Sequence, residues 1–112
     1  MTELDKRLLA YLHVVHRGDE ALLADLRRAW SGVLMVNRRG PPRDVIGQDV
    51  GSGCADMESL ASMSLANPDL AERLRSGALL NQPDSATFYG GDAHGYIDYP
   101  TITPAQQAEA AA

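Results

Sequence analysis

Residues 8–15 read LLAYLHVV, a nearly continuous apolar run that lacks the polar alternation of a half-exposed strand. A strand covered on both of its faces has this pattern, as in parallel sheets. A short helix is the alternative, but the two consecutive valines and the tyrosine favour a strand. We therefore expect a buried strand here, and its parallel partners must come from later in the chain.

The segment after this strand has the pattern of an amphipathic helix. Over residues 21–30, three leucines and Trp30 recur at helical spacing, and charged side chains occupy the opposite face. Asp19 is suited to cap the helix start. A second buried strand is expected over residues 32–37, and Pro41 and Pro42 follow where no helix can continue.

The remainder of the chain gives weaker signals. A helix over residues 43–50 is weakened by Gly47, and a third strand over residues 55–60 is a poor one because it contains Glu58 and Ser59. Asn67 and Pro68 predict a helix start, which leads to a helix that ends at Gly77. Loops follow, and we expect residues 104–112, rich in alanine and glutamine, to be a disordered tail. The alternating order predicts an α/β fold with parallel strands.

Composition excludes several classes of protein. A chain of 112 residues and 12.1 kDa is one domain, and its net charge of −5 argues against nucleic-acid binding. The single cysteine, Cys54, excludes an internal disulfide framework and fits a reducing compartment. No apolar run approaches the roughly 20 residues of a membrane-spanning helix. Glu3 and Asp5 precede the first apolar run, and no cleavage site follows it, so we expect a cytoplasmic protein rather than a secreted one.

Three parallel strands make an incomplete sheet. Parallel sheets need cover on both faces, and an open edge invites association with another strand. The pattern therefore indicates part of a larger assembly or a chain that pairs with another.

Three motifs indicate which assembly this is. Residues 8–102 resemble the C-terminal part of the Old Yellow Enzyme family of flavin-dependent alkene reductases. The resemblance rests on AYLHVV at 10–15, on LANPDLAERL at 65–74, and above all on FYGG at 88–91 followed by GYIDYP at 95–100. It covers most of the chain but only the final part of a barrel of roughly 250 residues or more.

The resemblance implies the last three β/α units of a TIM (β/α)8 barrel, incomplete as a single chain, over residues 1–103. Residues 8–15, 33–36 and 57–60 would be strands six, seven and eight. The family uses FMN, which NAD(P)H reduces and which passes hydride to an electron-poor alkene such as an enone. The family's proton-donating tyrosine and its carbonyl-binding pair have no counterpart here, and His13 and His16 are not that pair.

Three residues are candidates for cofactor binding. Tyr89 matches a family tyrosine that lines the pocket beside the flavin. Arg38 and Arg39 stand after strand seven, where the family has small residues; they either bind a phosphate by charge or block its approach to the backbone. After strand eight the resemblance implies a glycine and an arginine, but Ala61 and Ser62 stand there.

We therefore expect a segment of an alkene reductase that is catalytically incompetent alone, whether a gene remnant or a piece completed by an upstream barrel segment. The alternative is a non-catalytic module that associates with a second copy or a partner chain. A third interpretation is a chain that is only marginally stable or partly unfolded. No catalytic residue and no metal site is expected, because the histidines and Cys54 lack ligand spacing.

Overall fold

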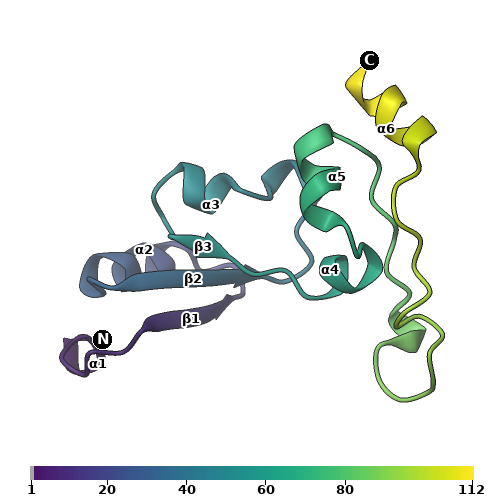
Figure 1. The fold of residues 1–112 in the computed structure, drawn as a ribbon. Helices are drawn as coiled ribbons and strands as arrows, with labels where there is room; N and C mark the ends of the chain where they lie inside the picture. Colours follow the sequence, from purple (N-terminus) through teal and green to yellow (C-terminus); the bar gives the residue numbers. More distant parts are fainter. Residues whose placement is uncertain (1) are drawn as a thin grey trace. The chain divides into compact units, whose positions relative to one another are not determined.

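The computed structural model describes residues 2–112, which form two compact units divided between Leu60 and Ala61. The first unit contains a parallel sheet and the helices that connect its strands (Figure 1). Its elements are α1 (Thr2–Asp5), β1 (Tyr11–His16), α2 (Glu20–Ala29), β2 (Val33–Arg38), a 3-10 turn (Arg43–Val45), α3 (Gln48–Gly51) and β3 (Met57–Glu58).

The sheet has the strand order β1-β2-β3, and both pairings are parallel. The predicted α/β order is thus confirmed, with β1 beginning and ending later than the apolar run suggested. Strand β3 is only two residues long, as the polar residues in its segment indicated. Strands β1 and β3 lie at the edges of the sheet, which is open.

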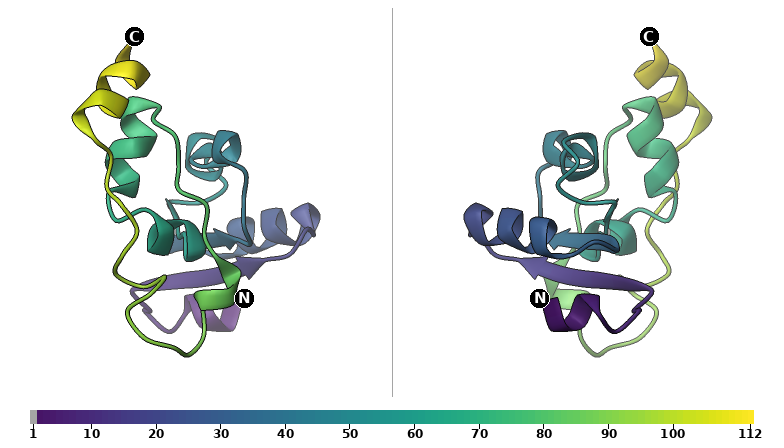
Figure 2. Two further views of the ribbon diagram at one scale, coloured as in Figure 1. Left: turned by 90° about the vertical axis from the view of Figure 1, so that its right-hand side faces the viewer. Right: turned by 90° about the vertical axis from the view of Figure 1, so that its left-hand side faces the viewer.

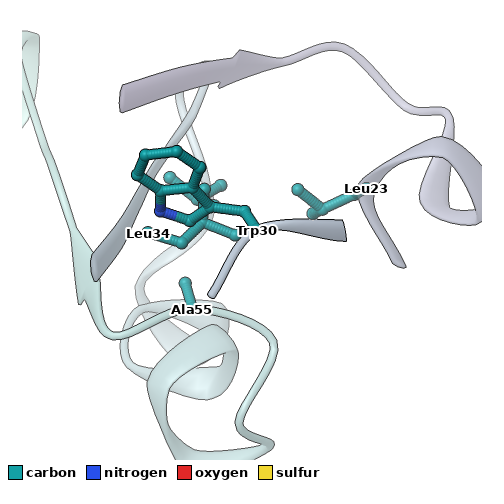
Figure 3. Close-up of a cluster of buried hydrophobic side chains, with 5 residues drawn as sticks. Leu23, Trp30, Leu34 and Ala55 are labelled. Atoms are coloured by element: carbon teal, nitrogen blue, oxygen red, sulfur yellow. The ribbon is translucent and has the colours of Figure 1, made fainter. Parts of the chain in front are cut away.

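One face of the sheet is covered and holds the core of this unit. Leu23 and Trp30 from α2 and its C-terminal end pack against Leu34, Val36 and Ala55 (Figure 3). The indole Nε1 of Trp30 donates to the Val33 carbonyl at 2.9 Å, so the ring is buried without an unpaired donor. Figure 2 shows α2 and α3 on the same side of the strands.

The opposite face of the sheet is bare. The register places Tyr11 beside Val33 and Met35 beside Met57, so the alternate residues of all three strands share this face. Apolar side chains on it are exposed: Tyr11 by 53%, Val15 by 58% and Met57 by 47%. We call this surface the bare face; a parallel sheet in a stable assembly buries both faces.

The second unit consists of short helices joined by long loops. Its elements are α4 (Ser62–Ala66), α5 (Leu70–Ser76), a 3-10 turn (Ser85–Thr87) and α6 (Pro104–Ala111). Arg73 is 3% exposed and holds the unit together, donating to Asp69 at 2.7 Å and to the carbonyls of Leu79 and Pro100 at 2.6 and 2.9 Å. A buried guanidinium is tolerated here because a carboxylate and two carbonyls satisfy it.

Two expectations for this unit differ from the structure. Asn67 does not cap a helix: its side chain bonds the carbonyls of Met63 and Asn81 and accepts from the Asn81 N–H at 2.7 Å. Residues 104–112 were expected to be disordered, but the structure has helix α6 there. A capping box between Thr103 and Gln106 satisfies the first backbone donors of that helix, and alanine has the highest helix propensity.

Candidate functional site

The carboxyl ends of the parallel strands are the natural place for a site, because ligands of open α/β sheets bind there. His16, Arg38 and Glu58 are the last residues of β1, β2 and β3. The alternation along each strand places all three on the covered face, where α2 and α3 lie.

Arg38 is the centre of a network of ion pairs. Its Nε and Nη2 donate to the Asp49 carboxylate at 2.6 and 2.8 Å, and its Nη1 and Nη2 donate to Glu20 at 2.7 and 3.1 Å. Asp49 is 6% exposed, so it depends on the guanidinium for its compensation. Four of the five N–H donors of Arg38 are thereby used, which leaves little for a phosphate.

His16 and Glu20 extend the network toward β1. The buried His16 ring places Nε2 at 2.9 Å from the Glu20 carboxylate and at 3.1 Å from the Gly18 backbone nitrogen. A protonated Nε2 donates to Glu20, whereas an unprotonated one accepts from Gly18; one tautomer cannot do both. The hydrogen bonds from Arg38 and then from His16 lower the pKa of Glu20 from 4.5 to about 2.

Glu58 is not the unpaired carboxylate that a charge in a buried strand suggests. Its two oxygens accept from the backbone N–H groups of Gly47 and Asp49, at 2.7 and 2.9 Å. These donors begin α3, where no earlier turn of helix can supply acceptors. Glu58 therefore fixes α3 on the sheet, and α3 in turn presents Asp49 to Arg38.

Arg39 stands apart from this network. It is exposed, and it lines an open cavity of about 400 Å³ together with His16, Arg17, Gly18 and Arg38. The structure thus brings the two arginines predicted for phosphate binding to one place, but in different states. Arg38 is held by carboxylates, whereas no hydrogen bond or ion pair of the Arg39 side chain is found in residues 2–112.

Tyr89 lies in the second unit, in a loop that is tied across its base. The Asp84 N–H donates to the Tyr99 hydroxyl at 2.8 Å, and Asn81 donates to the Pro100 carbonyl at 2.8 Å. Gly95, at a φ of +71°, packs so closely on Thr87 that a Cβ would overlap it. Tyr89 itself is 94% exposed, so within this chain its ring lies in solvent rather than in an enclosed pocket.

Sequence reasoning missed a polar cluster on the bare face. His13 Nε2 lies 2.8 Å from the Ser59 hydroxyl, and the Asn37 amide donates to the carbonyl and hydroxyl oxygens of Ser59 at 2.8 and 3.1 Å. His13 lies in the middle of β1, Asn37 lies near the end of β2, and Ser59 directly follows β3. Their shared position was readable once the register was known, but not from spacing in the chain.

The remaining candidate for chemistry is Cys54. Its thiol is half-buried and lines the same surface hollow as Asp49. Burial raises the pKa of the thiol, which disfavours the reactive thiolate. No group of three or more histidine, cysteine or carboxylate side chains able to hold a metal ion occurs in the described part of the chain. None of its helices, over residues 2–112, combines the length and apolarity needed to cross a bilayer.

These residues do not fit a flavin phosphate in the way the resemblance implies. The guanidinium of Arg38 is taken by two carboxylates, and side chains longer than glycine occupy the end of β2. Ser62, which replaces the expected arginine, is the first residue of α4 and carries no charge.

Comparison with known proteins places these features in a family. No family model matches the chain. A putative 12-oxophytodienoate reductase from Oryza sativa subsp. japonica is 46% identical over 81 residues, covering 71% of this chain and 25% of the relative. A probable flavin mononucleotide-dependent alkene reductase from Leishmania infantum is 40% identical over 104 residues, covering 88% and 28%.

Solved structures give the same result. A morphinone reductase determined in complex with tetrahydroNAD matches with a TM-score of 0.81 and 37% identity, over 93% of this chain and 29% of that protein. The Old Yellow Enzyme from Trypanosoma cruzi matches with a TM-score of 0.74 and 33% identity, over 91% and 30%. The chain thus spans between a quarter and a third of the length of these relatives. In sequence and in structure, the chain is therefore related to the C-terminal segment of the Old Yellow Enzyme family of alkene reductases.

Proposed function

We propose that this chain supplies the last three β/α units of an alkene reductase barrel, with β1, β2 and β3 as strands six, seven and eight. The observation that carries the proposal is the bare face, where Tyr11, Val15 and Met57 are exposed on an open parallel sheet. A closed barrel buries that face as its interior and pairs both edge strands. The barrel segment is residues 1–103, and residues 104–112 lie outside it.

The reaction of the completed barrel is the reduction of an electron-poor alkene, such as an enone, by NAD(P)H through FMN. When bound to the completed barrel, FMN would supply the hydride-transfer chemistry between NAD(P)H and the alkene. Among the predicted site residues, Tyr89 would line the pocket and Arg39 would offer positive charge near the end of strand seven. Arg38 has a different role, because it fixes Glu20 and Asp49 and so holds α2 and α3 on the sheet.

The chain alone does not catalyse this reaction under the proposal. Arg38 is occupied, Ser62 carries no charge, and Tyr89 lies in solvent. Catalysis requires an upstream barrel segment that covers the bare face and supplies the proton-donating tyrosine and the pair of residues that binds the substrate carbonyl. We place the protein in the cytoplasm, in keeping with its single cysteine.

A second copy of the chain is the other occupant that the bare face could take. The free edge of β1, with six residues in strand conformation, favours this alternative. A homo-oligomer would hide the same apolar side chains without forming a flavin site. It would be a discrete, colourless species in size-exclusion chromatography with light scattering.

Co-expression separates these proposals. The chain is produced alone, and also together with the part of the Leishmania infantum relative that precedes its matching region; each product is purified and mixed with FMN, NADPH and cyclohexenone. We expect flavin retention and enone-dependent NADPH oxidation only for the pair. Turnover by the chain alone would contradict its incompetence. A pair that neither associates nor retains flavin would contradict the barrel proposal.

A further inference from the structure

A buried histidine at the end of β1 has two hydrogen-bond partners that require opposite states of its ring nitrogen. The His16 side chain is 7% exposed. Its Nε2 lies 3.1 Å from the Gly18 backbone nitrogen, which donates to it, and 2.9 Å from Oε1 of Glu20, which accepts. Accepting from Gly18 requires an unprotonated Nε2, whereas donating to Glu20 requires a protonated one. The ring therefore satisfies one partner at a time, and its protonation decides which.

In the neutral ring we expect Nε2 to accept from Gly18. The Glu20 carboxylate already accepts from Arg38 at 2.7 and 3.1 Å, and its side chain is 63% exposed, so it does not depend on the imidazole. The Gly18 N–H, by contrast, has no other acceptor among residues 2–112. Gly18 also has a φ of +98°, which glycine adopts readily and other residues rarely. Its bond to the ring ties the turn between β1 and α2 to the end of the sheet.

A proton on the ring reverses this preference. In the neutral state Nε2 and Oε1 of Glu20 are two acceptors 2.9 Å apart, and a proton on Nε2 converts their repulsion into a charge-assisted hydrogen bond. Glu20 and Asp49 share the single guanidinium of Arg38, so this group of side chains has an excess of one negative charge that an imidazolium balances. The same proton removes the acceptor of the Gly18 N–H, because two donors then face each other.

Other titratable and charged groups surround the ring. They come from the neighbouring elements and loops: Glu20 on α2, Arg38 on β2, Asp49 on α3, Glu58 on β3, Cys54 between α3 and β3, and Arg17, Asp19 and Arg39 in the loops. The hydrogen bond from Arg38 lowers the pKa of Glu20 to about 2, so the partner carboxylate is ionised when the ring takes up its proton. Burial raises the pKa of Cys54 and keeps it a thiol. Histidine is the side chain that ordinarily changes charge between about pH 5 and 8.

We propose that His16 is a pH-dependent switch: the neutral ring holds the turn at Arg17 and Gly18 against the sheet, and the protonated ring binds Glu20 and releases that turn. The turn follows a strand at the carboxyl end of the sheet, so its release changes the backbone at the end where open α/β sheets bind ligands. All the groups involved belong to the first unit. The switch needs no barrel, flavin or partner chain, and its test is decided separately from the proposed function.

The test is an NMR titration of the full 112-residue chain, labelled with ¹⁵N, from about pH 8 to about pH 5. The ring nitrogens of His16 report which of them carries the proton, and the Gly18 amide reports the turn through its shift and its exchange with water. We expect the Nδ1–H tautomer at the high end and a Gly18 shift with the same midpoint as the ring. Corrected for the intrinsic effect of pH on exchange, the protection of Gly18 should fall by about fivefold to tenfold, the loss of one hydrogen bond.

Variants separate the switch from general effects of pH. His16→Gln has no titratable ring and should leave the Gly18 shift flat, whereas Glu20→Gln removes the charge that favours the imidazolium and should move the Gly18 response to lower pH. His13→Gln is the matched control, because His13 also lies on β1 but bonds to Ser59 on the bare face, and it should leave the Gly18 response unchanged. Circular dichroism spectra that match the parent chain show that the fold is kept.

The titration of the parent chain decides the proposal even if His16→Gln does not fold. An Nε2–H tautomer at the high end of the titration would overturn it, and so would a His16 ring that keeps its charge throughout. A Gly18 amide that does not follow the ring, or a Gly18 response that disappears in His13→Gln, would be equally decisive against it.

Discussion

Replacing Arg38 tests whether the ion-pair network, rather than a ligand, explains this residue. Arg38→Met keeps much of the aliphatic bulk and removes every hydrogen bond to Glu20 and Asp49. The Asp49 side chain is 8% exposed and would become a buried carboxylate without its cation, whereas the Glu20 side chain is 63% exposed and would be solvated. Asp49 therefore accounts for most of the stability lost in Arg38→Met, and Glu20 for little of it.

The expected change in the free energy of unfolding follows from this difference in burial. Removing one partner of a fully buried ion pair costs about 3–5 kcal/mol, and an exposed pair is worth about 0–1 kcal/mol. The Arg38 side chain is itself 28% exposed, which places its pair with Asp49 below the buried range. We expect Arg38→Met to lower the free energy of unfolding by about 2–3 kcal/mol, and Glu20→Gln by about 1 kcal/mol or less.

Urea unfolding followed by the fluorescence of Trp30 measures both changes, because this single tryptophan is 2% exposed within the same unit. Arg28→Met is the matched control, since Arg28 is 71% exposed and, among residues 2–112, forms its ion pair with Asp25 alone. It should cost less than about 0.5 kcal/mol. The double variant Arg38→Met with Asp49→Leu should recover part of the loss, because it removes the stranded charge. An effect of Arg38→Met no larger than that of Arg28→Met would refute the reasoning.

Three further perturbations follow from the geometry. The hydrogen bond from Arg38 lowers the pKa of Glu20 from 4.5 to about 2, so its stabilisation is present above pH 4.5 and lost as the pH falls toward 2; Glu20→Gln should flatten acid unfolding in that window. The Asp98 carboxylate raises the pKa of His94 by hydrogen bonding, and Asp98→Asn should lower it, as an NMR titration of the ring would show. Gly95→Ala should destabilise the tied loop more than Gly91→Ala does, since both glycines have positive φ but only Gly95 meets a neighbouring side chain; faster loop proteolysis would report it.

Local patterns in the sequence predicted the elements that depend on local physics. The apolar run at 8–15 and the spacing of Leu22, Leu23 and Leu26 led to β1 and α2, and Asp19 caps α2 by accepting from the Leu22 N–H at 2.9 Å. Helix α6 was not predicted, although the sequence carries a local signal for it. Thr103 and Gln106 have the spacing of a capping box. Composition outweighed that signal in the prediction of a disordered tail.

Long-range pairing explains what the sequence could not show about the site. Arg38 meets Asp49 and Glu20 across 11 and 18 residues, and Glu58 meets the start of α3 across nine or more. Nothing in the sequence distinguishes such partnered charges from free ones, so Arg38 and Arg39 looked alike. The register of β1, β2 and β3 decides which side chains share a face, and only the structure provides it.

Alternation along β2 separates two kinds of chemistry at its carboxyl end. Neighbouring residues of a strand point to opposite faces, so Arg38 is directed to α2 and α3 while Asn37 is directed to the bare face, beside Ser59 and His13. A group that approaches the bare face near this end therefore meets an amide, a hydroxyl and an imidazole rather than a guanidinium. If a barrel closes over that face as proposed, strand seven contributes the Asn37 amide to the interior near its end. Arg17 and Arg39 lie instead on the loops that follow β1 and β2, and both are exposed in this chain.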